Sequence, residues 1–446
     1  MQSSTADVAA RASLQARVGA SSLTQTATVS NHTIWLLIIL GFAFVLRLAW
    51  IAYSDWQPMP DDDAFRYDFT ARALLEGQGY VHLNGAPTAF WPPGYPLLLA
   101  SVYRLFEDTV AVAQLLNVLL GTATVGLVYL IGRRTLGMMP ALVGAAIVAA
   151  FPSLIFFTAV TLSEVTFTFL ALLAIYLLVL ETQSGRGRHL PLLLAAGLVL
   201  GYAVLVRGQA LLLPIVFVPF WLRTGVRWPG ISHKLVALAL GIGLMVAPWS
   251  IRNAIQMESP VFLSTNAGIN FWIGNHEGAT GRGQLADELV YAYPELTTVQ
   301  REVRVNAEAS RRGLAYALTH PVQEVSLSIK KLFWLYYHDS EGLSWNEGHG
   351  GQPFLSSLER VALFGLSNIY YFAVLGFFAL GVRLWFSLRD PGSVLLISII
   401  VYWTLVHVAF FGDPRFHAPI MPIVALLAAV PIVALWARRT TESRRT

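Results

Sequence analysis

Long apolar runs constrain the fold of this chain more than any other feature. The first, Ile34 to Tyr53, is about as long as a helix that crosses a bilayer. It is too long for the core of a signal peptide and no small-residue cleavage pattern follows it, so we interpret it as a retained span. Further runs occupy residues 110–131, 140–157, 162–180, 190–206, 209–222, 234–251, 366–386, 393–411 and 416–436. The pattern predicts an all-α polytopic membrane protein with about ten transmembrane helices.

Composition excludes several classes of protein. Hydrophobic residues make up 55% of the 446 residues and charged residues 13%, against roughly 25% charged in soluble domains, so a soluble globular fold is ruled out. The net charge of +4 comes from scattered arginines, which leaves no basic patch for nucleic acid. The absence of cysteine excludes a thiolate nucleophile, an iron–sulfur cluster and a cysteine zinc site. Chemistry must therefore use oxygen and nitrogen side chains.

The number of crossings depends on the 209–222 run, which is short enough to be re-entrant instead. With this run counted as a span, the basic residues fall in alternate loops and in the C-terminal tail, as the positive-inside rule requires. They are Arg133, Arg134, Arg186, Arg188, Arg223, Arg227, Lys234, Arg383, Arg389, Arg438, Arg439, Arg444 and Arg445. This distribution predicts ten crossings, cytoplasmic termini and two long outward segments, residues 54–109 and 252–365.

Five regions follow from this topology. Residues 1–32 are rich in Ser, Thr and Ala and are expected to form a disordered cytoplasmic tail. Residues 33–251 form a seven-span part that contains the first outer loop, 54–109. Residues 252–365 form a second outer loop with interfacial helices, including an amphipathic stretch from Ser326 to Tyr337 that either lies in the membrane interface or packs over the bundle. Residues 366–437 add three spans, and 438–446 form a basic cytoplasmic tail.

Three adjacent carboxylates open the first outer loop, at Asp61, Asp62 and Asp63. Their mutual repulsion is expected to raise the pKa of at least one, which would suit a general base near neutral pH. If Asp63 begins a helix, Arg66 and Tyr67 lie one turn further along its own side. The alternative is a solvated acidic turn that caps the helix N-terminus.

Aromatic and charged residues mark the outer ends of several spans. Trp91 and Tyr95 flank a proline turn and suit either membrane anchoring or stacking on a sugar ring. Glu164 stands at the outer start of an apolar span, where an ionisable group requires a partner. Arg207 lies between two spans at the same level, and its guanidinium could bind a lipid phosphate or simply reach the interface. Arg47 invites the same two interpretations.

A further outward cluster combines amide, aromatic and basic side chains. Short amides suit sugar hydroxyls and aromatic rings suit sugar faces, although a polar loop without ligand would look similar. The candidate substrate-binding residues here are Arg252, Asn253, Asn275 and His276. Arg415, in a short outward turn before the last span, could contact phosphate or pair with Asp413. His276 and His417 are isolated in the sequence, which is typical of structural histidines.

The first outer loop carries the most specific resemblance to a known family. The stretches Asp63 to Tyr67, Ala71 to Tyr80 and Pro92-Pro93 resemble the first periplasmic loop of the GT-C glycosyltransferases of family 39. That family includes the protein O-mannosyltransferases and the lipid A aminoarabinose transferases. Weaker similarities continue along most of the chain: the acid that begins the fourth span, a Trp-x-x-Arg-Asn segment, an Asn-x-Gly loop, and an Arg-x-x-x-Pro-x-x-Pro segment at the last span.

The resemblance implies transfer of a sugar from a polyprenyl phosphate on the outer leaflet to an external acceptor. It implies that Asp63 is the catalytic first-loop acid, that Glu164 is the second acid, and that Arg207 holds the donor phosphate. Trp91 stands where the aminoarabinose transferases have a lysine, so their donor and acceptor do not carry over. Residues 252–365 do not clearly supply the folded insert of the protein mannosyltransferases.

We therefore predict a GT-C-like glycosyltransferase of the bacterial plasma membrane, with its active site on the outer face. Asp63 would deprotonate the acceptor hydroxyl while Arg207 and Arg415 neutralise the departing lipid phosphate, which inverts the anomeric centre. A divalent cation bridging the phosphate and Asp61–Asp63 is an open alternative. Two other functions are a ligase or polymerase using a polyprenyl diphosphate donor, and a lipid or small-molecule transporter. The sugar and the acceptor (protein, lipid or polysaccharide) are not specified.

Overall fold

The computed structural model describes residues 25–60, 62–106, 109–185, 189–284, 289, 292–348 and 352–442. Within these ranges the chain is helical apart from turns, loops and two isolated bridges, Val81 to Pro87 and Arg282 to Gly412. Most of the predicted N-terminal tail, residues 1–24, lies outside the described residues. Its last part differs from the prediction, because the first helix already begins at Gln25.

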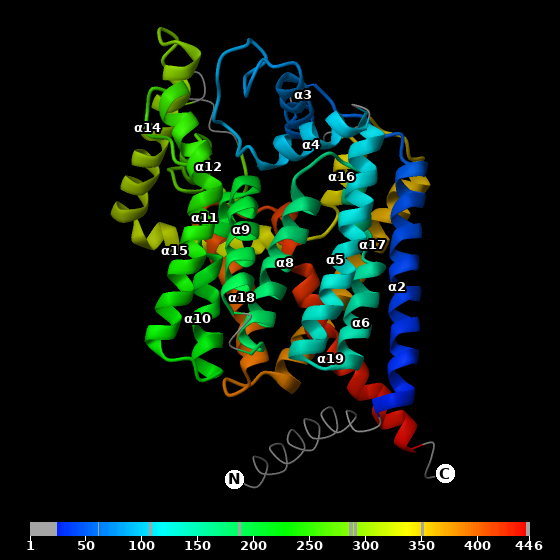
Figure 1. Ribbon diagram of the computed structural model, residues 1–446. Helices are drawn as coiled ribbons and strands as arrows, with labels where there is room; N and C mark the ends of the chain where they lie inside the picture. Colours follow the sequence, from blue (N-terminus) through cyan, green and yellow to red (C-terminus); the bar gives the residue numbers. More distant parts are fainter. Residues whose placement is uncertain are drawn as a thin grey trace.

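Eight helices of the described chain are long and apolar enough to cross a membrane. They are α2 (Gln25–Tyr53), α5 (Val110–Thr135), α8 (Glu164–Thr182), α9 (His189–Val206), α11 (Trp228–Gln256), α17 (Ser357–Trp385), α18 (Pro391–Ala409) and α19 (Met421–Glu442). Figure 1 shows them standing side by side in one bundle. The predicted all-α polytopic membrane fold is confirmed.

The other two predicted spans are irregular. Helix α6 (Met138–Ala149) is followed by α7 (Pro152–Phe156) and η2 (Phe157–Ala159) at an angle of 59°. Pro152 explains this bend, because proline favours an extended conformation in the residue before it and cannot continue the hydrogen-bond ladder. The 209–222 run becomes η4 (Gly208–Leu212) and α10 (Leu213–Arg223), which together are shorter than a full span.

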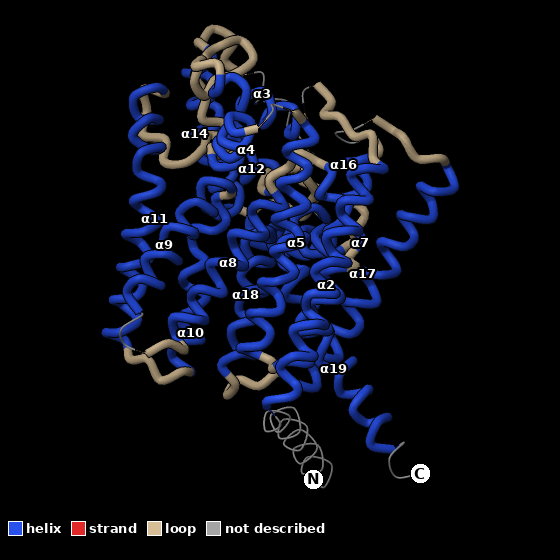
Figure 2. The backbone as a smooth tube through the Cα atoms, turned by 45° about the vertical axis from the view of Figure 1, so that its right-hand side comes forward, coloured by secondary structure: helices blue, strands red, loops and turns tan. Residues whose placement is uncertain are grey.

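Both long segments that were predicted to face outward lie at one end of the bundle. The first forms α3 (Asp63–Leu75) and α4 (Gly94–Leu105), and the second forms α12 (Ala267–Gly274), α14 (Thr298–Thr319), α15 (Pro321–Tyr336) and α16 (Glu341–Asn346). In Figures 1 and 2, α3, α4 and α14 stand above the spanning helices, at the end opposite the α5–α6 turn. We call this the loop-bearing end.

Helix α15 has one buried and one exposed apolar face. Leu327 and Leu335 are buried against the rest of the protein, whereas Val322, Val325 and Ile329 are more than half exposed. The predicted amphipathic stretch is therefore a helix packed over the bundle whose other face no described residue covers. An apolar stripe of this kind suits contact with lipid.

Close glycine contacts fix the position of the end of α9. A Cβ atom on Gly241 of α11 would lie 2.7 Å from the Cα of Gly197, so only glycine allows the two helices to approach this closely. A Cβ atom on Gly94 would lie 2.6 Å from the backbone carbon of Leu205. Helix α4 therefore begins directly against the last turn of α9, immediately before Arg207.

Candidate active site

Four charged side chains from distant parts of the sequence meet at the loop-bearing end. Arg207 Nη2 donates to Glu164 Oε1 at 2.5 Å, and Arg415 Nε donates to the same oxygen. Arg415 Nη1 reaches Asp63 Oδ2 at 3.1 Å. Arg207 Nε also donates to Ser163 Oγ at 2.9 Å. We call Asp63, Glu164, Arg207 and Arg415 the charged network.

Each member of the network stands at the end of a helix. Asp63 is the first residue of α3 and Glu164 the first of α8, whereas Arg207 directly follows α9. Arg415 lies at the start of η5 (Pro414–Ile420), where Asp413 accepts a hydrogen bond from its backbone N–H. Helix ends at one level of the bundle thus bring the four residues together, although up to 352 positions separate them in the sequence.

Only one member of the network is substantially exposed. The side chain of Glu164 is 2% exposed and those of Arg207 and Arg415 are 9% exposed, whereas that of Asp63 is 37% exposed. Two carboxylates and two guanidiniums balance in charge, which offsets the cost of removing them from water. Asp63 is therefore the carboxylate that a molecule from the aqueous side can reach.

The network retains unused hydrogen-bonding groups. Among the described residues, no partner accepts from Arg207 Nη1 or from Arg415 Nη2. Glu164 Oε2 is buried and has no hydrogen-bond partner there either. The two arginines can thus offer further donors to an anion without releasing Glu164.

Aromatic residues line one side of the network. The ring of Tyr67 meets Tyr95 edge-on at 5.2 Å and Trp91 at 6.4 Å between ring centroids. Burial, and then the charge of Asp63, raise the pKa of Tyr67 above its ordinary value, although the two arginines oppose the shift. Tyr67 consequently stays neutral and forms a wall beside Asp63. Arg66 is half-buried on the same helix.

Trp345 is a member of the site that the sequence did not indicate. Its ring lies 4.7 Å from the guanidinium carbon of Arg415, within range of a cation–π interaction. Its backbone carbonyl accepts a hydrogen bond from the indole of the buried Trp56 at 2.9 Å. No sequence motif marks Trp345, and its contact with Arg415 arises only when the tertiary fold brings α16 next to η5.

The bundle contains a small apolar pocket, with room for about one water, that neither arginine lines. It lies between α8, α10, α18 and the start of α19, and Gln209 and Pro419, which closely follow Arg207 and Arg415, are among its lining residues. The rest of the lining is mostly aliphatic and aromatic, for example Phe167, Leu172, Leu213, Trp403 and Ile423.

Asp62 and Asp63, which are adjacent in the sequence, have different partners in the structure. Asp62 caps α3 and accepts hydrogen bonds from the backbone N–H groups of Phe65 at 2.7 Å and Met59 at 3.1 Å. Its pKa is raised, first by burial and to a lesser extent by the charge of Asp63. The capping interpretation is therefore correct for Asp62, whereas Asp63 points to Arg415. Asp61 lies outside the described residues, and the described chain contains no group of three His, Asp or Glu side chains placed to hold a metal.

The amide cluster predicted to bind a sugar instead joins loops together. Arg252 donates to the backbone carbonyls of Thr88 at 2.6 Å and Tyr80 at 2.8 Å. Asn253 is fully buried and donates to the carbonyl of Val261. The structure thus directs these polar groups to backbone partners rather than to the charged network.

Asn275 and the histidines of this region also have protein partners. Asn275 is buried, donates to the carbonyl of Ala409 at 3.0 Å and accepts from Lys331 Nζ at 2.7 Å. The ring of His276 contacts the neighbouring carbonyl of Glu277 at 2.6 Å. His417 stands alone in the sequence, but in the fold its Nε2 lies 3.1 Å from Asp339 Oδ1, and both residues are buried.

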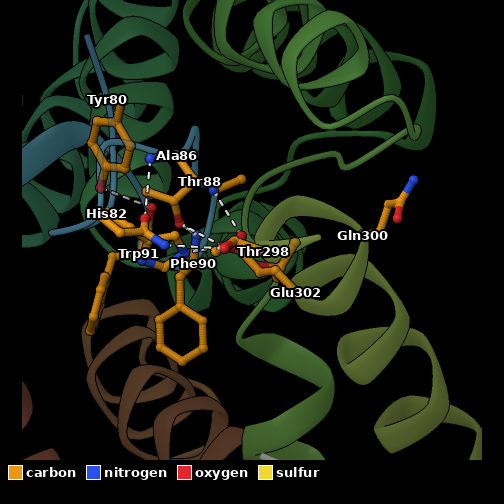
Figure 3. Close-up of polar contacts among 12 residues, drawn as sticks. Tyr80, His82, Ala86, Thr88, Phe90, Trp91, Thr298, Gln300 and Glu302 are labelled. Atoms are coloured by element: carbon orange, nitrogen blue, oxygen red, sulfur yellow. Dashed lines mark hydrogen bonds and ion pairs between the residues drawn. The ribbon is translucent and has the colours of Figure 1, made fainter. Parts of the chain in front are cut away.

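Glu302 on α14 joins the two outer loops, as Figure 3 shows. Its carboxylate contacts His82 Nε2 at 2.6 Å and accepts from Thr88 Oγ1 at 2.8 Å and the Ala89 N–H at 2.9 Å. Thr265 Oγ1 donates to it at 2.5 Å from the second loop. Burial alone would raise the pKa of Glu302, but these hydrogen bonds lower it below the ordinary value of 4.5. The first loop, which carries Tyr67, Trp91 and Tyr95, is thereby tied to α14 of the second loop.

The substitution Glu302→Gln is expected to lower the free energy of unfolding by about 1–3 kcal/mol, because it removes charge-assisted hydrogen bonds from a buried site. Since the folded pKa is depressed, the stabilisation is present above pH 4.5 and is lost as the pH falls through the folded value. Thermal unfolding in detergent at several pH values measures the effect. Glu295→Gln is the control, because Glu295 is an exposed carboxylate of the same outer loop and exposed charges contribute little to stability. Equal losses in both variants would contradict this assignment.

Comparisons with known proteins agree with this fold. Residues 91–251 match the sequence model of the family described as dolichyl-phosphate-mannose-protein mannosyltransferase. No curated protein is similar enough in sequence to match. Among solved structures, the chain resembles the oligosaccharyltransferase AglB from Archaeoglobus fulgidus, in complex with an inhibitory peptide and a dolichol-phosphate. The TM-score is 0.56 and the identity 15%, over 93% of this chain and 52% of AglB.

A looser likeness is to ArnT from Cupriavidus metallidurans bound to undecaprenyl phosphate, with a TM-score of 0.46 and 16% identity over 87% of this chain and 78% of ArnT. The chain spans about half the length of AglB. It has the fold of the GT-C superfamily, and the resemblance found in the sequence is confirmed at that level.

Proposed function

We propose that this GT-C membrane protein is an inverting glycosyltransferase, which moves a single sugar from a polyprenyl phosphate to an acceptor hydroxyl on the outer face of a bacterial plasma membrane. One observation carries the proposal. An accessible carboxylate, Asp63, is paired with an arginine that also holds Glu164, and both network arginines keep spare donors.

In the proposed reaction, Asp63 accepts the proton of the acceptor hydroxyl as the hydroxyl oxygen attacks the anomeric carbon. The bond between that carbon and the phosphate oxygen breaks, and its electron pair remains with the phosphate. The free donors of Arg207 and Arg415 then stabilise the growing negative charge in a site shielded from water. One displacement of this kind inverts the configuration at the anomeric carbon.

The family match supports the proposed donor. The pocket between α8, α10 and α18 is apolar but has room for only about one water, so a polyprenyl chain could enter there only if these helices moved apart. The description of the matching family names dolichyl-phosphate-mannose as the sugar donor. AglB is in complex with a dolichol-phosphate, and dolichol is a polyprenol. The aromatic wall of Tyr67 and Trp91 would contact the sugar.

A polyprenyl diphosphate donor is the competing proposal, since AglB is an oligosaccharyltransferase. A diphosphate carries more negative charge than a phosphodiester and would require more converging cations. Within the described residues, the charged network contains two guanidiniums that are already balanced by two carboxylates. This balance favours the singly charged phosphodiester donor.

The decisive experiment incubates the purified protein with a panel of polyprenyl-phosphate sugars and with the matching diphosphates, in the presence of peptide, lipid and polysaccharide acceptors. The expected result is release of polyprenyl phosphate together with a glycosylated acceptor, from monophosphate donors only. Turnover of the diphosphates alone would favour the ligase. If no donor is consumed and wild type binds no polyprenyl phosphate, the proposed function is wrong.

The substitution Arg207→Gln is expected to weaken binding of the polyprenyl-phosphate donor by about tenfold to a hundredfold, because a hydrogen bond to a charged group contributes about 1.5–3 kcal/mol. Fluorescence or calorimetric titration in detergent measures the change. Arg223→Gln is the matched control, since Arg223 is exposed at the last residue of α10. An unchanged donor affinity in Arg207→Gln would remove this residue from the phosphate site.

A further inference from the structure

Arg47 is a buried cation that the proposed mechanism does not use. It lies in α2 with a residue exposure of 1%. Its guanidinium donates to three backbone carbonyls, those of Ala43 at 3.1 Å, Ala149 at 3.1 Å and Val148 at 3.2 Å. No carboxylate of the described chain pairs with it. Two of these carbonyls belong to the last residues of α6, where a positive charge is favourable. These contacts use Nη1 and Nη2 but not Nε.

Arg47 and Glu164 line one small cavity, and each has a buried polar atom without a hydrogen-bond partner in the described chain. Arg47 Nε and Glu164 Oε2 are both buried and have no hydrogen-bond partner in the described chain. Both residues line the cavity, together with Thr124 and Thr168. Glycine at position 121 makes room for the arginine, because a Cβ atom there would lie 2.9 Å from Arg47 Nε.

We propose that Arg47 is a positioning residue of the site, which is linked to Glu164 through one water molecule in this cavity and adds a positive charge beneath the network. This inference rests on the proposed function. The cavity has room for one water, and a buried water requires two to four polar partners. Arg47 Nε would donate to the water, which would donate to Glu164 Oε2 and to Thr124 Oγ1. Thr124 can accept because its own hydroxyl proton is already given to Leu120 O at 2.9 Å.

The charge of Arg47 has a specific use in the proposed reaction. Asp63, Glu164, Arg207 and Arg415 sum to zero, so Arg47 gives the site a net charge of +1. The donor phosphodiester carries one negative charge, whereas the polyprenyl phosphate left after transfer approaches two. Arg47 is therefore expected to stabilise the product phosphate, and the transition state that leads to it, more than the donor.

Two probes separate this electrostatic role from a general loss of structure. They are undecaprenyl phosphate and its monomethyl ester, which carry the same lipid but differ by one negative charge at pH 8. Arg47→Gln is expected to weaken binding of undecaprenyl phosphate by about tenfold and binding of the methyl ester by less than about threefold. Arg47→Lys keeps the charge and should remain within about threefold of wild type for both probes. Arg133→Gln, an exposed arginine at the far end of α5, is the control.

Each outcome decides the inference. A selective loss for the doubly charged probe, restored by lysine, supports it. Equal weakening of both probes in Arg47→Gln and Arg47→Lys would show that Arg47 only holds α2 against α6, and unchanged affinities would exclude any coupling to the phosphate site. If Arg47→Gln does not fold, Arg47→Met serves as the neutral variant, because methionine suits a buried site, and a ratio of the two affinities equal to that of wild type would then contradict the inference. Failure of wild type to bind either probe would instead contradict the proposed function.

Discussion

Replacing Asp63 by asparagine is expected to lower kcat by about 10²- to 10⁴-fold, while donor binding changes by less than about threefold. Asparagine keeps the size and a hydrogen-bond acceptor for Arg415 but cannot take the proton of the acceptor hydroxyl. Arg207 and Arg415 remain in place because Glu164 still holds both of them. Single-turnover transfer with a labelled donor measures the chemical step, and a separate titration measures donor affinity.

Asp55→Asn is the matched control for this experiment. Asp55 is an exposed aspartate in the segment before α3 and has no contact with the charged network in the structure. Wild-type rates are expected for this variant. Transfer at the parental rate by Asp63→Asn would show that another group accepts the proton, and a parallel loss of donor affinity would indicate that Asp63 acts through Arg415 instead.

Glu164→Gln is expected to have the largest effect on stability. The two buried arginines share Glu164 Oε1, so neutralising it leaves their charges poorly compensated, and a broken buried pair costs about 3–5 kcal/mol. A bound phosphate anion should replace part of the missing charge. Undecaprenyl phosphate is therefore expected to raise the Tm of Glu164→Gln more than it raises that of wild type, because a ligand that binds the folded state stabilises it.

Glu181→Gln separates this result from the general effect of losing a buried glutamate. Glu181 is fully buried near the opposite end of the bundle, where it pairs with Lys234 and contacts His189 Nδ1 at 2.7 Å. This variant should also lose stability, but undecaprenyl phosphate should shift its Tm by the same amount as in wild type. If undecaprenyl phosphate raised the Tm of all three proteins equally, the arginines that pair with Glu164 would not be the groups that bind phosphate.

The spanning helices and the members of the charged network could be found from the sequence for a simple physical reason. A long apolar run has few alternatives to a membrane helix. Ionisable residues at the ends of such runs must find partners or a function. Asp63, Glu164, Arg207 and Arg415 all occupy this kind of position, and the fold brings them into one network.

The loop residues were harder to interpret, since amides that hold loops together look like amides that bind a ligand. Asn253 and Asn275 have the composition of a sugar site, yet their side chains bind backbone carbonyls. Trp345 and Glu302 were missed because their partners lie far away in the sequence and no local pattern marks them. Interactions of this kind depend on the tertiary fold rather than on periodicity or spacing.

The bend after α6 determines which backbone carbonyls remain available to a buried cation. In a straight helix the carbonyls of the last turn would bind N–H groups one turn ahead. Pro152 has no N–H to offer the carbonyl of Val148, so that oxygen accepts a long hydrogen bond from the Phe151 N–H at 3.4 Å and another from the guanidinium of Arg47 at 3.2 Å. The bend at this proline therefore leaves backbone carbonyls at the end of α6 able to bind a buried arginine, within a segment whose side chains are apolar throughout.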